Sequence, residues 1–102
     1  LYYFDSTGNW TPTDADAAAT TKGMLAIALG TSSATNEMLL YGFYRNTNYS
    51  FTAGDTLYVS TASGQITNTQ PSGTNDVVRV VGYAIAADEI YFNPSQDWIE
   101  IV

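Results

Sequence analysis

The sequence predicts an all-β fold, a small antiparallel β-sandwich or partly open β-barrel built from hairpins. Three observations carry this prediction. A sequence pattern of aromatic residues, a polar turn and Trp occurs twice, over residues 2–10 and 90–98. A looser version, with Gly64 in its turn, runs over residues 57–66. Short apolar runs elsewhere alternate with loops rich in Gly, Pro, Asn and Ser, as expected of strands joined by turns.

Each copy of the repeated pattern predicts a β-hairpin. The aromatic residues run into Asp5 or Asn93, and short side chains of this kind bond their own backbone and start turns. Trp10 and Trp98 open the return strands, and we expect their indole rings to plug the ends of the core. In the third hairpin, Gly64 supplies the positive φ that such a turn needs.

The first half of the chain predicts two further strands. Residues 11–23 predict a crossing loop with one helical turn, because Asp14 is a good N-cap but the alanine run is too short for a stable helix. Residues 24–29 alternate large and small side chains, which predicts a strand against a close neighbour. Residues 30–36 predict a polar turn, and residues 38–44 a strand.

The middle of the chain predicts two polar loops around a strand. Residues 46–55 are irregular and turn into a strand over residues 56–60. In the loop over residues 67–76, Pro71 and Gly73 block regular structure. We expect both loops to reach the surface.

Residues 77–85 predict the strongest strand. Both of its faces are apolar, as expected of a central strand covered on each side. Gly82 within it indicates a bulge or a close approach of another backbone segment. The last strand, over residues 98–102, is expected to tie the end of the sequence into a sheet.

Composition limits the classes of function. The chain has 102 residues, with three basic, ten acidic and no His or Cys residues, and a net charge of −7. Its length fits a single domain over residues 1–102 that buries roughly two-thirds of its unfolded surface. Nucleic acid and anionic membranes are not expected as partners, because their phosphates need clustered Lys and Arg. Only 13% of residues are charged, so little electrostatic repulsion opposes packing of subunits, and we expect a homo-oligomer.

No targeting or membrane segment is recognised. No apolar run approaches the ~18 residues of a membrane span, and no charged n-region precedes an apolar core as in a signal peptide. Because the sequence starts at Leu1 rather than Met, we expect a processed product or a domain of a longer protein.

Catalytic residues, cofactors and metals are not expected. Without His and Cys, nucleophilic triads and zinc sites lose their usual members. Asp14 and Asp16 have the spacing of part of a calcium loop, but the Gly and distal Glu of an EF-hand are missing. The pair at residues 88–89 can act like glycosidase carboxylates only if folding brings it to Asp97 or Glu100. A solvated loop and a charged turn are the simpler interpretations.

The candidate binding surface consists of Tyr44, Asn46, Asn48 and Tyr49. Exposed aromatic rings beside amide side chains can hold the faces of sugars, since the rings are apolar and the amides donate and accept hydrogen bonds. Phe51 is expected in the core or at a subunit contact. For Tyr49, core and surface both remain open.

Nearly the whole chain resembles a domain that recurs in tailed-bacteriophage virion proteins, often at the C-terminus of tail-fibre or tail-appendage polypeptides. The resemblance lies in an ordered set of segments, over residues 22–30, 54–60, 70–74, 76–83, 90–94 and 98–100. It implies an all-β module, usually in a homo-oligomer, carried outside the capsid. It brings no catalytic or binding residue that transfers to a position of this chain.

The function expected from these observations is that of a tail-fibre or appendage domain of a virion. A trimer is favoured, with other virion proteins as partners and a host-surface glycan as a possible ligand. Attachment would then depend on avidity, through loops repeated by symmetry. The alternatives are a capsid decoration protein that stabilises the phage head and a subunit of an extracellular filament.

Overall fold

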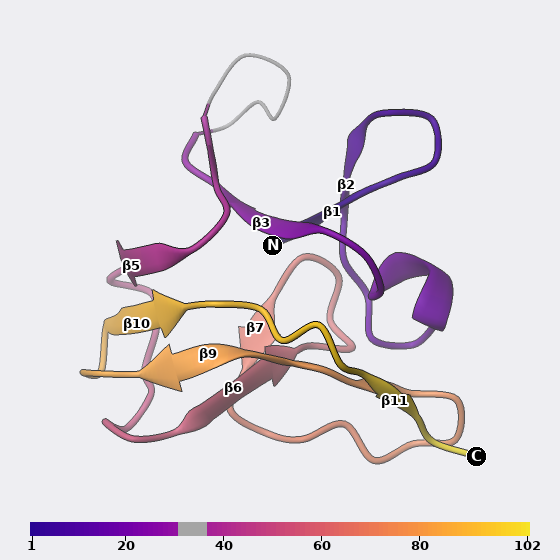
Figure 1. Ribbon diagram of the computed structural model, residues 1–102. Helices are drawn as coiled ribbons and strands as arrows, with labels where there is room; N and C mark the ends of the chain where they lie inside the picture. Colours follow the sequence, from indigo (N-terminus) through magenta and orange to yellow (C-terminus); the bar gives the residue numbers. More distant parts are fainter. Residues whose placement is uncertain (31–36) are drawn as a thin grey trace.

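The computed structural model describes residues 1–30 and 37–102, and it folds as a small antiparallel β-sandwich (Figure 1). Its first sheet has the order β2-β1-β3-β4, its second the order β5-β10-β9-β6-β7, and a ribbon pairs β11 with β8. The first sheet comprises β1 (Tyr2–Phe4), β2 (Trp10–Pro12), β3 (Leu25–Ala28) and β4 (Met38–Leu39). The second comprises β5 (Gly42–Arg45), β6 (Thr56–Val59), β7 (Ile66–Thr67), β9 (Val80–Ala84) and β10 (Glu89–Phe92). The ribbon comprises β8 (Val77–Val78) and β11 (Ile99–Glu100).

The predicted all-β class is confirmed. All the strand pairs are antiparallel, and none of the sheets formed by the described residues closes into a barrel. A turn of 3-10 helix, η1 (Ala18–Thr20), interrupts the strands, as the alanine run predicts, but its N-cap is Ala17, without a side-chain hydrogen bond, and not Asp14 as predicted. Its shortness follows from the cost of nucleating a helix that cannot extend.

The first and third predicted hairpins are confirmed. In the first, β1 pairs with β2, and Tyr3 lies opposite Thr11. The Asp5 carboxylate accepts hydrogen bonds from the backbone nitrogens of Thr7 at 2.9 Å and Asn9 at 3.0 Å. The third hairpin joins β6 to β7 and turns at Gly64, whose φ is +74°. The short polar side chain and the glycine therefore act as their sequence positions indicate.

The predicted second hairpin, over residues 90–98, is wrong. After β10 the chain does not return along β10, and Ile99 instead pairs with Val78 of β8. Trp98 is 38% exposed and Trp10 packs edge-to-face on Phe4 with ring centroids 5.0 Å apart. Neither indole belongs to the core cluster, so the prediction that they plug its ends is also wrong. A local sequence pattern cannot specify which distant strand a segment will pair with.

Two predicted strands are divided. Residues 38–44 form β4 and most of β5, which belong to different sheets. Gly42, the first residue of β5, has a φ of +133° that glycine adopts most readily. Residues 77–85 form β8 and β9, with a break at Arg79. The central position of β9 is confirmed, but coverage of both faces is not, because Tyr83 and Ile85 are exposed. The polar turn predicted over residues 30–36 lies, beyond Gly30, outside the described residues.

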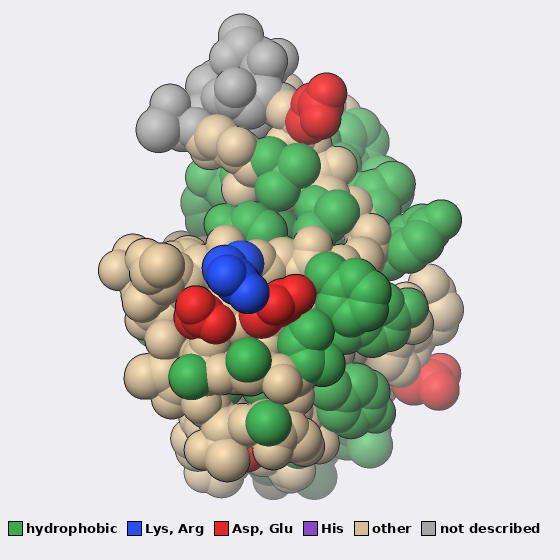
Figure 2. Space-filling model, turned by 90° about the vertical axis from the view of Figure 1, so that its left-hand side faces the viewer, with side chains coloured by type: hydrophobic (Ala, Val, Ile, Leu, Met, Phe, Trp, Pro, Cys, Tyr) green, Lys and Arg blue, Asp and Glu red, His purple; other side chains and the backbone are tan. Residues whose placement is uncertain are grey.

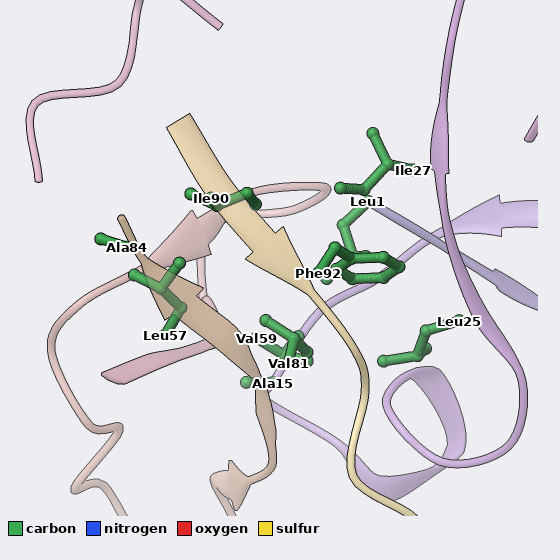
Figure 3. Close-up of a cluster of buried hydrophobic side chains, with 10 residues drawn as sticks. All are labelled: Leu1, Ala15, Leu25, Ile27, Leu57, Val59, Val81, Ala84, Ile90 and Phe92. Carbon is green, nitrogen blue, oxygen red and sulfur yellow. The ribbon is translucent and has the colours of Figure 1, made fainter. Parts of the chain in front are cut away.

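The core fills the space between the two large sheets. Leu25 and Ile27 of β3 face Ile90 and Phe92 of β10, as Figure 3 shows. The other members of this cluster are Leu1, Ala15, Leu57, Val59, Val81 and Ala84. Among the described residues, each sheet buries its inner face mainly against the other, which positions the outer face of the second sheet toward solvent.

Candidate functional site

The two aromatic residues of the predicted binding surface, Tyr44 and Tyr49, pack with Phe51 at the end of β5. The Tyr44 and Tyr49 rings meet at an angle of 64° with centroids 6.2 Å apart, and the Tyr49 and Phe51 rings are 5.0 Å apart. All three side chains are half-buried and pack against the core. Burial, and secondarily Tyr44, raises the pKa of Tyr49 to about 12, so its phenol stays neutral.

The loop that follows β5 is held by backbone contacts to the turn before β10. The backbone nitrogen of Asn46 donates to the carbonyl of Asp88 at 2.9 Å, and that of Phe51 donates to Ala87 at 3.0 Å. The Asn46 side-chain oxygen accepts a hydrogen bond from the backbone nitrogen of Asn48 at 2.9 Å. This Asx turn uses the Asn46 side-chain oxygen, and none of the hydrogen bonds among the described residues involves its amide NH₂.

Three of the four predicted site residues line one hollow. Tyr44, Asn46 and Tyr49 share a depression of about 230 Å³ with Tyr2 and Gln65. Asn48 is exposed and does not line it. The volume lies below the roughly 300–1,000 Å³ of ordinary small-molecule sites. The hollow can admit one small group, and its role in glycan binding stays a prediction.

The outer face of the second sheet carries an aromatic row that the sequence analysis did not recognise. Tyr91 of β10 lies opposite Phe43 of β5 on one side and Tyr83 of β9 on the other. The Phe43 and Tyr91 rings have centroids 5.2 Å apart. Phe43 is 66% exposed and Tyr83 52%. These three residues are called the aromatic row below. Only the strand register, which is a tertiary property, aligns them.

A single ion pair borders the aromatic row. The Arg45 Nη2 lies 3.0 Å from the Glu89 Oε1. The hydrogen bond that Arg45 donates to Glu89, followed by the nearby charge of Asp88, raises the pKa of Arg45. Figure 2 shows one basic side chain between two acidic ones on this side of the molecule, with hydrophobic side chains gathered beside them. The charge of Arg45 thus offsets part of the acidic charge beside the aromatic row.

The acidic residues considered for catalysis or metal binding have other contacts. Glu89 pairs with Arg45 at the start of β10, whereas Glu100 lies in β11, at the far end of the molecule in Figure 1. The Asp14 Oδ1 accepts a hydrogen bond from the backbone nitrogen of Asp16 at 2.9 Å. Among the described residues, no group of three or more His, Cys, Asp or Glu side chains is arranged to hold a metal ion.

Arg79 is the functional candidate that the sequence analysis missed. Its side chain is only 3% exposed. Nε donates to the carbonyl of Ser95 at 2.9 Å, and Nη1 donates to those of Thr21 at 2.8 Å and Gly23 at 2.7 Å. The one available signal was a lone Arg inside an otherwise apolar strand, since charged side chains are almost never fully buried without a partner.

Comparison with protein-family models, with curated protein sequences and with solved structures gives no match to this chain. The resemblance to phage virion domains therefore stays a prediction. In the part of the chain that the structure describes, no helix is long and apolar enough to cross a membrane.

Proposed function

We propose that this chain is a structural β module of a bacteriophage particle, a tail-fibre or appendage domain that assembles with copies of itself and contributes to host-surface attachment. The observation that carries the proposal is the aromatic row on the outer face of the second sheet. Three aromatic side chains aligned across strands form the kind of surface that subunit contact covers.

The electrostatics of this face support contact between copies. Ten acidic residues make two copies of the chain repel one another over most orientations. Beside the aromatic row, Arg45 and Glu89 neutralise each other. Aromatic residues are enriched at interface cores and charges are depleted there, so the aromatic row suits contact between copies. A homo-oligomer is what the resemblance implies, and a trimer is the assembly proposed.

Attachment is proposed to use the loop after β5. Tyr44, Asn46 and Tyr49 present rings and an amide to one hollow, with Asn48 exposed beside them. A hollow of this size gives weak binding, because few ligand atoms are covered. Repetition of the site in a homo-oligomer raises the overall avidity by orders of magnitude without any new contact.

The edge of the second sheet supports one alternative, the subunit of an extracellular filament. β5 pairs with β10 on one side and is the edge of the described sheet on the other. Backbone groups at an open edge can accept a strand from a neighbouring copy. Electron microscopy separates the alternatives, because a filament subunit forms helical polymers whereas an appendage domain forms discrete particles.

The assembly is tested with the paired variant Phe43→Thr/Tyr83→Thr. Threonine suits an exposed strand position but removes the apolar area of the aromatic row. Sedimentation equilibrium should show the parent chain as an oligomer and the paired variant as a monomer. The control is Ile99→Thr, which removes an equally exposed apolar side chain from the ribbon and should remain oligomeric. A monomeric parent chain at high concentration would contradict the proposal.

A further inference from the structure

We propose that the groove above Arg79 binds the carboxylate of an acidic sugar. The inference deepens the proposed function, on which its biological setting rests, by naming the class of saccharide and a second place on the chain where it binds. The groove lies apart from the hollow beside Tyr49, since the two share no lining residue.

Arg79 is a buried cation without an acidic partner. Its three hydrogen bonds all go to neutral backbone carbonyls. All ten acidic residues of the chain lie among the described residues, and none of them forms an ion pair with Arg79. Burial alone lowers the pKa of its guanidinium. A buried arginine normally gains a carboxylate or phosphate partner, because desolvation of an unpaired charge is costly.

The N–H groups of Arg79 that make no hydrogen bond to the described residues are the ones that can bind such a partner. A guanidinium has five N–H groups, and the hydrogen bonds of Nε and Nη1 occupy three of them. Nη2 has no partner among the described residues. No fully enclosed side-chain nitrogen or oxygen lacks a partner in that part of the chain, so Nη2 is not fully enclosed, although Arg79 as a whole is only 3% exposed. Arg79 is among the residues that line a groove.

The groove combines the three kinds of contact that an acidic sugar needs. It has a volume of about 460 Å³, which falls within the roughly 300–1,000 Å³ of ligand sites. Tyr41, which is 70% exposed, offers a ring for the apolar face of a sugar. Asn93 and Gln96 offer amides for hydroxyl groups, and Nη2 offers two N–H donors for the carboxylate.

Charge favours a carboxylate over a phosphate. The net charge of −7 opposes the approach of any anion, and it opposes a doubly charged phosphate monoester about twice as strongly as a singly charged carboxylate. Only three basic residues are present in the sequence. Of these three, Arg79 lines the groove. The groove is thus where a basic side chain of this acidic chain can attract an anion.

The structural role of Arg79 does not account for Nη2. The bonds to Thr21, Gly23 and Ser95 already tie the strand break between β8 and β9 to two loops. A side chain with only these donors would serve that role. The two N–H groups left over have no partner among the described residues, and they are the ones assigned to recognition.

The test is an NMR titration of the full chain with methyl β-D-glucuronide, with methyl β-D-glucoside as the neutral control ligand and glucose 6-phosphate as the phosphate control. We expect the glucuronide to bind about tenfold more tightly than the glucoside, as a charge-assisted hydrogen bond allows. Shifts should concentrate at Tyr41, Asn93, Gln96 and the Nε–H of Arg79. Added salt should weaken the glucuronide affinity.

Variants identify the groups responsible. Tyr41→Ala removes an exposed ring without disturbing the core and should lower the glucuronide affinity about fivefold or more. Arg79→Lys keeps a positive charge but loses Nη2, and should reduce the preference for glucuronide over glucoside. If that variant unfolds, Gln96→Ala is a second test at the groove, because it removes an amide that is proposed to bind sugar hydroxyl groups, and it should lower the glucuronide affinity. Phe43→Thr, in the aromatic row, is the matched control and should bind like the parent chain.

Several outcomes would overturn the inference. These are no binding, equal binding of glucuronide and glucoside, tighter binding of glucose 6-phosphate, or shifts confined to Tyr44, Asn46 and Tyr49. The proposed function fails separately, through the oligomeric state. Glucuronide binding by a chain that stays monomeric would leave the groove assigned and the virion role rejected, whereas an oligomer that binds no glucuronide would do the reverse.

Discussion

Asp5 and Asp16 have the same side chain, but their surroundings affect stability in opposite directions. Asp5 accepts hydrogen bonds from Thr7, Asn9 and Thr11, and these lower its pKa far below 3.8. Desolvation, followed by the charge of Asp14, raises the pKa of Asp16 above that value. Neighbours determine which protonation state the fold prefers. The Asp5 turn could be read from the sequence, whereas the environment of Asp16 could not.

Asp5→Asn should lower the melting temperature at pH 7. The folded pKa of Asp5 lies below its unfolded value, so its stabilising contribution is complete above the unfolded pKa and is lost as pH falls through the folded one. The difference from the parent chain should therefore shrink on acidification from about pH 5 to about pH 2. Calorimetry over this range measures it, and a difference independent of pH would contradict the assignment. Thr11→Val, which removes only one donor, should give a smaller effect.

Asp16→Asn should raise the melting temperature at pH 7. Here the folded pKa lies above the unfolded one, so the charged form destabilises the fold above the folded pKa and the penalty disappears as pH falls below the unfolded pKa. The gain should be absent near about pH 3. Thermal unfolding followed by circular dichroism checks both conditions. An unchanged melting temperature at pH 7 would show that the repulsion is negligible.

Gly82 shows how one strand position shapes the second sheet. A Cβ at this position would overlap the carbonyl oxygen of Tyr91. The register between β6 and β9 shifts there, with Leu57 opposite Gly82 and Tyr58 opposite Val80. This bulge turns Val81 and Ala84 inward while Tyr83 points outward. The bulge was predictable from a glycine within an apolar strand, but its effect on the faces was not, because it depends on the partner strand.

Gly82→Ala should destabilise the chain by about 3 kcal/mol or more, since the overlapping atoms are backbone and must move. Gly54→Ala is the matched control. It has a φ of +94° but open space around the added Cβ, so it should cost about 1 kcal/mol from backbone strain alone. Urea unfolding at equilibrium compares them. Equal effects would mean that the close approach to β10 does not matter.

At the scale of the whole molecule, one core joins both large sheets. Phe92 and Ile90 contribute from β10 and Leu25 and Ile27 from β3, in a single cluster (Figure 3). Neither sheet has another described surface against which to bury its inner face. The sheets are therefore expected to unfold together, as small single domains generally do.

Phe92→Ala should cost about 3–5 kcal/mol, because it leaves a cavity beneath both sheets. The loss of stability should lower the unfolding midpoint of the first sheet as well as that of the second. In a Trp98→Phe background, Trp10 of β2 reports the first sheet by fluorescence, while far-ultraviolet circular dichroism reports all strands. Coincident transitions at a lower urea midpoint are expected. A Trp10 transition unaffected by the substitution would separate the sheets into independent units.

The all-β class, the turns at Asp5 and Gly64, and the bulge at Gly82 are specified locally, because they depend on side-chain chemistry and backbone freedom at single positions. The tertiary structure decided which strands meet, and so placed Ile99 against Val78 rather than beside β10. It also aligned the aromatic row and left Arg79 without an acidic neighbour. Such features arise between residues far apart in the chain, whose pairing is selected by burial of the whole core rather than by any local pattern.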